Sequence, residues 1–268
     1  MCSPTGFSRA VVLLAPLAFA LCPMDIHAQQ PTFADVVARS GFIFEGTVKA
    51  VGAATATMTK APNTAVVLVD RIIEVQKPFG NFTGKEVTVW LRNPEKTRPG
   101  DRAVFYTFVK AAGATLGVVE VSSEPVRPQD NVDSRVKDAR STLADRALAA
   151  RLATAQLVVV GVFGEGKPTE VARERRSEHD PMPWAAPIKV ETVLKGKADG
   201  QAVAIYASSD DVVWERSPKP NPGFEGVFLL QPDRDKRFGI AGLFLIDPLD
   251  VQPRAELDRI RRLLKAPR

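Results

Sequence analysis

Cysteine is almost absent from this chain of 268 residues, and its two cysteines, Cys2 and Cys22, both lie near the N-terminus. The chain beyond residue 22 therefore has no means to form a disulfide, a thiolate metal site or a cysteine nucleophile. Histidine is equally scarce, because only His27 and His179 occur. A single histidine after the N-terminal segment does not match the ligand spacing of a zinc site, so we expect no metal and no cofactor.

The chain also lacks a long apolar run beyond its N-terminus, where residues 10–22 form a short one after Arg9. That run is shorter than the roughly 18–20 residues of a membrane-spanning helix, and Ala28 precedes Gln29 as a small residue does at a signal cleavage site. We expect a signal peptide over residues 1–28, a secreted or periplasmic mature protein, and no transmembrane span. Lipidation at Cys22 is the alternative, but the bulky Leu21 fits that site poorly.

Neither sign of charge dominates, since 36 Lys and Arg stand against 31 Asp and Glu, for a net charge of +5. A nucleic-acid binder usually concentrates its charge in one stripe, and aromatic residues make up only 7% of this chain. We therefore expect no nucleic acid among its partners. The one basic concentration is a predicted helix over residues 253–265, which has the composition for contact with a membrane surface, although its apolar face favours packing on the protein.

Residues 157–170 read LVVVGVFGEGKPTE, in which Gly161, Gly166 and Lys167 have the spacing of a phosphate-binding P-loop. A P-loop needs Ser or Thr after its lysine to hold magnesium, and here Pro168 takes that place. The alternation of strands and helices in a P-loop domain is also missing. We interpret the segment as a strand that runs into a Gly-rich turn.

Internal repetition is the most informative feature that is present. The first half reads GFIFEGTV, TAVVLVDRIIEV, GKEVTVWL, PGDRAVFYTF and TLGVVEV, in residues 41–121. The second half reads QLVVVGVF, PIKVETVLKG, GQAVAIYAS, PGFEGVFLLQ and GIAGLFLID, in residues 156–247. Gly46 corresponds to Gly161, and Pro99-Gly100 corresponds to Pro222-Gly223. The chain is therefore predicted to be duplicated.

Apolar and polar residues alternate along these segments as they do along half-buried strands. Five short strands per copy predict a small closed barrel, so we expect a mainly β protein of two tandem five-stranded OB-like barrels, each followed by a helix. The first predicted helix covers residues 133–155, with Thr142 and Asp145 arranged like a capping box. The expected divisions are a signal peptide, a first repeat, a connecting helix and a second repeat, over residues 1–28, 29–130, 131–155 and 156–268.

The segments VLVDRIIEVQKPFG and VETVLKG, together with PGDRAVFYT and PGFEGVFLL, carry a resemblance to a known class. Over most of residues 34–252 the chain resembles the tandem OB-type barrels of the tissue-inhibitor-of-metalloproteinase and netrin-like class, in exported bacterial forms. Animal members of that class inhibit metalloproteases through an N-terminal cysteine that chelates zinc. The mature chain has no cysteine, so the resemblance implies the fold and not that mechanism.

One loop of the second copy, within residues 172–184, is longer and more basic than its Ala- and Thr-rich counterpart, residues 52–63. Loops that differ between copies often carry binding, and Arg and Trp are enriched at interface hot spots. Trp214 lies in another long connection, whereas Trp90 ends a regular strand and is expected in the core. The candidate binding residues are Arg173, Arg175, Arg176, His179, Trp184 and Trp214; a solvated surface loop is the structural alternative.

These observations favour a non-catalytic binding or interaction protein with a partner in the envelope or outside the cell. The alternative is a secreted or periplasmic hydrolase that uses His179 with loop carboxylates such as Glu178 and Asp180. No nucleophile, acid and base can be picked out by spacing, so we expect no catalytic residues. The ligand and the oligomeric state have no signature in the sequence.

Overall fold

The computed structural model describes residues 31–77, 79–169, 182–208, 214–236 and 238–266. The expected signal peptide, residues 1–28, lies outside the described residues. By its internal contacts the chain divides into Met1–Pro31 and Thr32–Arg268, and the second unit carries every helix and strand described below.

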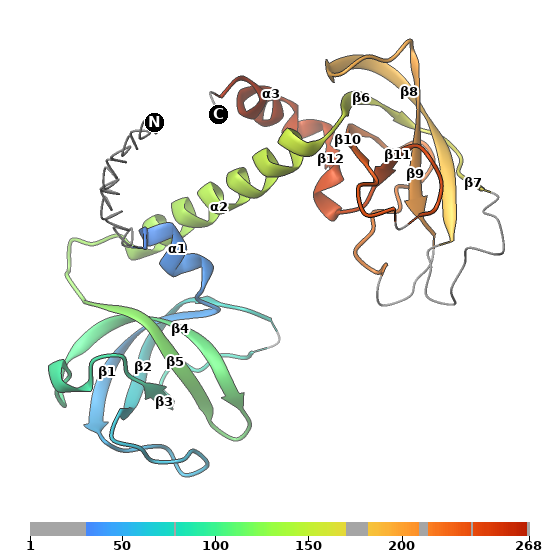
Figure 1. Cartoon of the computed structure of the whole chain (residues 1–268). Coiled ribbons are helices and arrows are strands. Elements are labelled where there is room, and N and C mark those ends of the chain that lie inside the picture. The colour runs from blue at the N-terminus through green and yellow to red at the C-terminus, as the bar shows by residue number, and fades with distance from the viewer. Residues whose placement is uncertain (1–30, 78, 170–181, 209–213, 237, 267–268) are drawn as a thin grey trace, which may run out of the picture. The chain divides into compact units, whose positions relative to one another are not determined.

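Five strands of the first half close into a barrel, here called barrel 1 (Figure 1). Neighbouring strands pair in the order β1-β2-β3-β5-β4, and β4 pairs with β1 to close the ring. All pairs are antiparallel except β3 with β5, which is parallel. The bounds are β1 Phe42–Val51, β2 Thr64–Val75, β3 Glu86–Trp90, β4 Arg102–Ala112 and β5 Leu116–Pro125.

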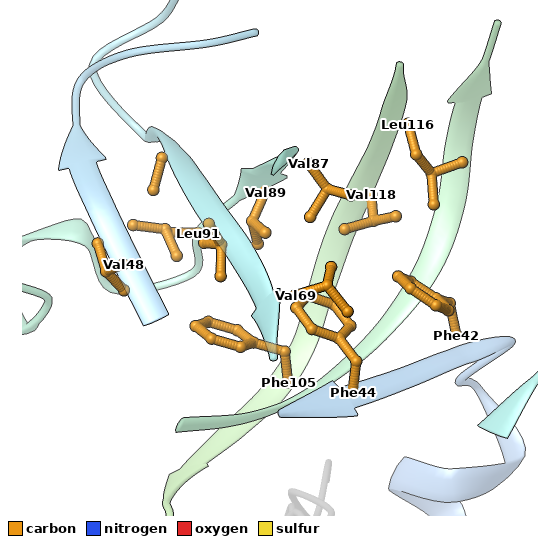
Figure 2. Packing of buried hydrophobic residues seen from close by; sticks show 12 residues of the cluster. Phe42, Phe44, Val48, Val69, Val87, Val89, Leu91, Phe105, Leu116 and Val118 are labelled. Carbon is orange, nitrogen blue, oxygen red and sulfur yellow. The ribbon is translucent and has the colours of Figure 1, made fainter. Parts of the chain in front are cut away.

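Alternation along each strand fills barrel 1 with one set of side chains. Figure 2 shows Phe42, Phe44 and Phe105 among the valines that point to the common centre. The rings of Phe42 and Phe44 stack at 4.8 Å between centroids, and those of Phe44 and Phe105 at 5.3 Å. The interior of a small barrel is just wide enough for side chains to fill it, and these aromatic and β-branched residues do so.

The second half repeats the same connections and forms barrel 2. Its strands pair in the order β6-β8-β9-β11-β10, β10 returns to β6, and the pair of β9 with β11 is again parallel. The bounds are β6 Leu157–Phe163, β8 Pro183–Lys195, β9 Gln201–Ala207, β10 Glu225–Pro232 and β11 Leu243–Leu245; β7 Lys167–Pro168 pairs with β8, and β12 Val251–Pro253 pairs with β10. The mainly β fold of two OB-like barrels is confirmed.

The strand register shows which residues correspond in the two barrels. Phe44 pairs with Phe105 across β1 and β4, and Val159 pairs with Phe228 across β6 and β10. Gly46 and Gly161 occupy the same place two residues further along. Gly161 lies inside β6, and Lys167 lies in the two-residue strand β7 rather than at the start of a helix. The segment therefore has the strand geometry expected of it and not that of a P-loop.

Each barrel is followed by a helix. The helices are α1 Phe33–Ala38, α2 Val132–Thr154 and α3 Leu257–Lys265, with short 3-10 turns η1 Pro94–Lys96, η3 Pro248–Asp250 and η4 Arg254–Glu256. The first part of α2 packs on β4 through Val136 against Tyr106, and the last part packs on β6 through Leu152. Ile260 of α3 joins that second cluster.

The predicted capping box in α2 was wrong. The helix begins earlier, where the Asn131 side chain accepts a hydrogen bond from the Ser134 N–H, and Thr142 lies mid-helix with its hydroxyl donated to the Asp138 carbonyl. The backbone N–H groups near Thr142 lie within the helix and already donate to carbonyl oxygens of the preceding turn. The Thr-x-x-Asp pattern therefore has no free N–H group to cap. None of the helices in the described part of the chain is long and apolar enough to cross a membrane.

A buried ion pair links the end of α2 to barrel 2. The Asp250 carboxylate is fully buried and accepts hydrogen bonds from Arg151 at 2.5–2.9 Å, with further donors in the Ile246 and Asp247 N–H groups and the Gln231 amide. Burial raises the pKa of Asp250, while these donors oppose that rise. The carboxylate is therefore tied to its place by several groups at once.

We expect Gly161→Ala to cost about 1–3 kcal/mol of unfolding free energy, because a Cβ there would lie 2.2 Å from the Lys189 carbonyl oxygen. Gly113→Ala is the matched control, since open space surrounds that position. Urea denaturation of both variants measures the difference. Equal stabilities would show that the close approach of β6 and β8 is not the reason for glycine at position 161.

We also expect Arg151→Met to cost about 3–5 kcal/mol, because it leaves the Asp250 carboxylate buried without its counter-charge. Arg261→Met is the control, since Arg261 pairs with Asp258 on the surface, where an ion pair contributes about 0–1 kcal/mol. Thermal and urea unfolding of the two variants would separate these cases, and similar losses would contradict the role given to Arg151.

Candidate binding face

Most of the loop that the sequence singled out lies outside the described residues. This holds for the basic candidates and the histidine, together with the carboxylates of the alternative hydrolase site: Arg173, Arg175, Arg176, Glu178, His179 and Asp180. The structure therefore places two of the candidate residues, Trp184 and Trp214.

These two tryptophans belong to different parts of barrel 2. Trp184 lies in β8, pairs with Tyr206 of β9, and packs against the barrel interior as a partly buried residue. Trp214 is only 5% exposed and belongs to a separate cluster with Phe238 and Phe244. The fold does not bring the two indoles together, and Trp214 has little surface to offer a ligand.

Trp214 covers the outside of barrel 2. Its ring centroid lies 5.1 Å from that of Phe238, which in turn lies 4.6 Å from Phe244 on β11. Ile205 and Ala207 of β9 complete this small second core. Trp214 and Phe238, which stand on either side of β10 in the chain, thus cover the outward side of Ile205, Ala207 and Phe244.

Barrel 1 has the same outer face with different residues. Val89 and Val118 pair across β3 and β5 in its interior, as Tyr206 and Leu245 pair across β9 and β11. The neighbouring outward positions therefore correspond: Trp90 to Ala207, Gly117 to Phe244, and Val119 to Ile246. On the next strand, Phe108 follows Phe105 by three residues, as Gln231 follows Phe228, so Phe108 corresponds to Gln231. Gln231 is 3% exposed, because α2 and η3 supply its hydrogen-bond partners.

Phe108, by contrast, is 42% exposed. It pairs with Val119 across β4 and β5, and Val119 pairs with Trp90 across β5 and β3, so three apolar side chains lie in a row across three strands. Lys110 is two residues from Phe108, and its Nζ lies 4.5 Å from the centre of the Trp90 ring. We call Trp90, Phe108, Lys110 and Val119 the open face.

Loop 52–63 borders the open face on one side. Thr55 bonds through its N–H and hydroxyl to the Thr88 hydroxyl at 2.9 and 2.8 Å, and both Thr55 and Thr57 bond to Thr115. A Cβ at Gly117 would lie 2.8 Å from the Trp90 ring and 3.0 Å from the sulfur of Met58. Glycine at this position therefore makes room for the indole and for the tip of the loop.

Arg92 borders the open face on the other side. It follows Trp90 by two residues, and its Nη1 donates to the Val121 carbonyl at 2.8 Å. The nearby Glu120 is buried, and its carboxylate accepts from the Arg92 N–H and the Ser123 hydroxyl. The acid is thus turned inward, and the charges presented beside the apolar row are Lys110 and Arg92.

Another buried titratable group, Tyr106, also has structural partners. Burial and the neighbouring Glu124 raise the pKa of Tyr106, whose hydroxyl donates to Glu124 at 2.6 Å, and Arg135 bonds the same carboxylate. Among the described residues no three or more His, Cys, Asp and Glu side chains group closely enough to hold a metal ion. Barrel 1 also has a shallow pocket of about 430 Å³ beside loop 52–63, lined by Phe82, Lys85, Glu86 and small residues.

The open face was not predicted from the sequence, and Trp90, which was expected in the core, is only partly buried and lies on the outward side of β3. The alternation Phe108-x-Lys110 on a strand was visible, but whether another segment covers it was not. Comparison of the two copies gives the one usable signal, since Gly117 stands where the second copy has the large Phe244.

No protein-family model matches the chain, and no curated protein matches it. Among solved structures it is similar to the wild-type single-stranded DNA-binding protein of Thermus aquaticus, at 10% identity and a TM-score of 0.17, over 72% of this chain and 85% of that one. A deletion mutant of the same protein matches at 11% identity and a TM-score of 0.16, over 74% and 89%.

These structures correct the exclusion of nucleic acid as a partner. Single-strand binding by an OB-type barrel needs a basic groove and a few aromatic rings, and a low overall aromatic content does not exclude that arrangement. The two structures named above are those of a single-stranded DNA-binding protein. At such TM-scores the similarity assigns no ligand to this chain, so nucleic acid has to be included in any binding test.

We expect Trp214→Ala to cost about 3–5 kcal/mol of unfolding free energy, because it empties the second core of barrel 2. Phe108→Ser on the open face should cost no more than about 1 kcal/mol, the range of strand propensity. Urea denaturation followed by circular dichroism compares them. A larger loss for Phe108→Ser would mean that Phe108 supports the fold rather than a surface.

Proposed function

We propose that the protein is an exported, non-catalytic binding protein whose binding surface is the open face of barrel 1. One observation carries the proposal: in two barrels with the same connections, Gln231 on β10 is 3% exposed, whereas Phe108 at the corresponding place on β4 is 42% exposed, next to the partly buried Val119 and Trp90. Adjoining apolar side chains with a polar rim are typical of interaction sites, and Phe108, Val119 and Trp90 adjoin in this way.

The chemistry of the open face supports binding rather than catalysis. Phe108, Val119 and Trp90 offer apolar contact, and Lys110 and Arg92 offer charge-assisted hydrogen bonds at its rim. Trp and Arg are the residue types that most often dominate binding energy at protein interfaces. The open face has no hydroxyl, thiol, imidazole or carboxylate side chain, and its one amine, Lys110, lies over the Trp90 ring.

The resemblance to the tissue-inhibitor-of-metalloproteinase and netrin-like class belongs to this proposal at the level of the fold. Two OB-like barrels in one exported chain would suit a relative of that class. The inhibitory cysteine has no counterpart after residue 22, so the proposed binding does not act through zinc chelation.

Site-specific photo-crosslinking tests the binding surface. Benzoylphenylalanine in place of Phe108, in tagged mature protein mixed with envelope and extracellular fractions of the source cells, should give a discrete adduct. The same group in place of Val203, which is 56% exposed on barrel 2, is the matched control. An adduct at position 108 that is absent at 203 and lost in Lys110→Glu is the expected result.

Equal labelling at both positions, or no adduct at either, would count against the open face. A turnover of any substrate that disappears in His179→Ala would contradict the non-catalytic part of the proposal and favour the hydrolase. Both experiments use the whole mature chain.

Export is tested by expression of the full chain in a bacterial host and by mass spectrometry of the exported product. We expect the periplasmic or secreted form to begin at Gln29, as cleavage after Ala28 requires. A product in those fractions that begins at Cys22 and carries lipid would favour the lipoprotein alternative, and retention of residues 1–28 on a protein confined to the cytoplasm would contradict export.

A further inference from the structure

The side chains of the open face indicate the chemical class of the partner that it binds. This inference rests on the binding role proposed above. In barrel 1 the open face lies on the outward side of β3, β5 and β4, and at Trp90, Val119 and Phe108 these strands already pair with one another. Recognition has to use the side chains that stand on β3, β5 and β4. The partner must therefore bring side chains of its own to Phe108, Val119 and Trp90.

The open face is poorly arranged for base stacking. A single-stranded nucleic acid uses a series of rings with accessible faces. The Trp90 ring lies against Gly117 and has the Lys110 ammonium over its face, so a base would have to displace Lys110 to stack there. Phe108 is left as the one ring of this surface without such a contact, and its neighbour Val119 is aliphatic. This mixture suits the apolar side chains of a protein.

The charges at the rim select the partner further. Lys110 and Arg92 stand on either side of the apolar row, and Glu120, the acid nearest to Arg92, is turned inward and bonded to the Arg92 N–H and to Ser123. Two cations beside an apolar centre attract carboxylates and repel a basic segment. A complementary surface has an apolar ridge with acidic residues along its edges.

We infer that the open face binds an acidic amphipathic segment of another protein, with its Leu or Phe side chains on Phe108 and Val119 and its carboxylates at Lys110 and Arg92. A helix presents such a pattern, because apolar residues every three or four positions form one stripe with acids beside it. The apolar contact supplies most of the affinity, and the two cations set which segments are accepted.

The test measures fluorescence anisotropy of three labelled probes with the mature chain. The first is a pool of short peptides in which Leu and Phe repeat every three or four residues and Glu fills the other positions. The second pool has Gln in place of Glu, and the third probe is an oligothymidylate. We expect the Glu peptides to bind at least about tenfold more tightly than the Gln peptides, and Phe108→Ser to weaken that binding about tenfold or more.

Matched variants decide between the outcomes. Val203→Ser on barrel 2 should leave the binding unchanged, and Lys110→Glu should favour a peptide pool that has Lys in place of Glu. Equal or tighter binding of the Gln peptides or of the oligothymidylate, lost in Phe108→Ser, would overturn the acidic segment and leave the open face as a binding surface. Binding that Phe108→Ser does not change, or no binding of the Glu peptides, would also overturn the inference.

The photo-crosslinking experiment separates failure of this inference from failure of the proposed function. An adduct at position 108 without affinity for the Glu peptides would keep the binding role and remove the acidic partner. Circular dichroism of Phe108→Ser and Lys110→Glu shows whether each variant keeps the β fold before it is compared.

Discussion

The parallel pair of β3 with β5, repeated as β9 with β11, is the constraint on which the rest of the structure depends. All other neighbours in the two rings pair in antiparallel fashion, and neither ring is complete without this parallel pair. Closure of the ring sets which residues point inward. Val89 and Val118, or Tyr206 and Leu245, then lie in the interior, and their neighbours along the strand have to lie outside.

The two copies differ in the residues on the outward side of these strands. In barrel 2 the outward residues Ile205 and Phe244 are covered by Trp214 and Phe238, so the chain forms a second small core there. In barrel 1 a glycine takes the place of Phe244, and the Trp90 ring occupies the space above it. The same frame thus buries Gln231 on β10 in one copy and leaves Phe108 exposed beside Lys110 at the corresponding place on β4 in the other, without a change in fold.

The repeat, the mainly β class and the barrel strands could be predicted from the sequence because they depend on local signals: alternation, Gly46 and Gly161 at a close approach, and the Pro-Gly turns. The start of α2 was misplaced because Thr142 and Asp145 have the composition of a cap, whereas Asn131 makes the bond that caps the helix. The candidate site was harder, because coverage is a tertiary property. Trp214 and Phe108 are both aromatic residues in plausible surface segments, and only the fold shows that the first is buried and the second is exposed.

The order in which the strands pair has a consequence for how the chain reaches this state. The β1–β2 and β4–β5 pairs are hairpins between neighbours in sequence, but Phe42 meets Thr107, and Trp90 meets Val119, only after long stretches of chain have been brought together. Closing loops of that length lowers the entropy of the chain before the contacts form. Folds dominated by such pairings reach the native state in milliseconds to seconds. We therefore expect the ring of each barrel to be completed after its hairpins, with the aromatic residues at its centre exposed until that step.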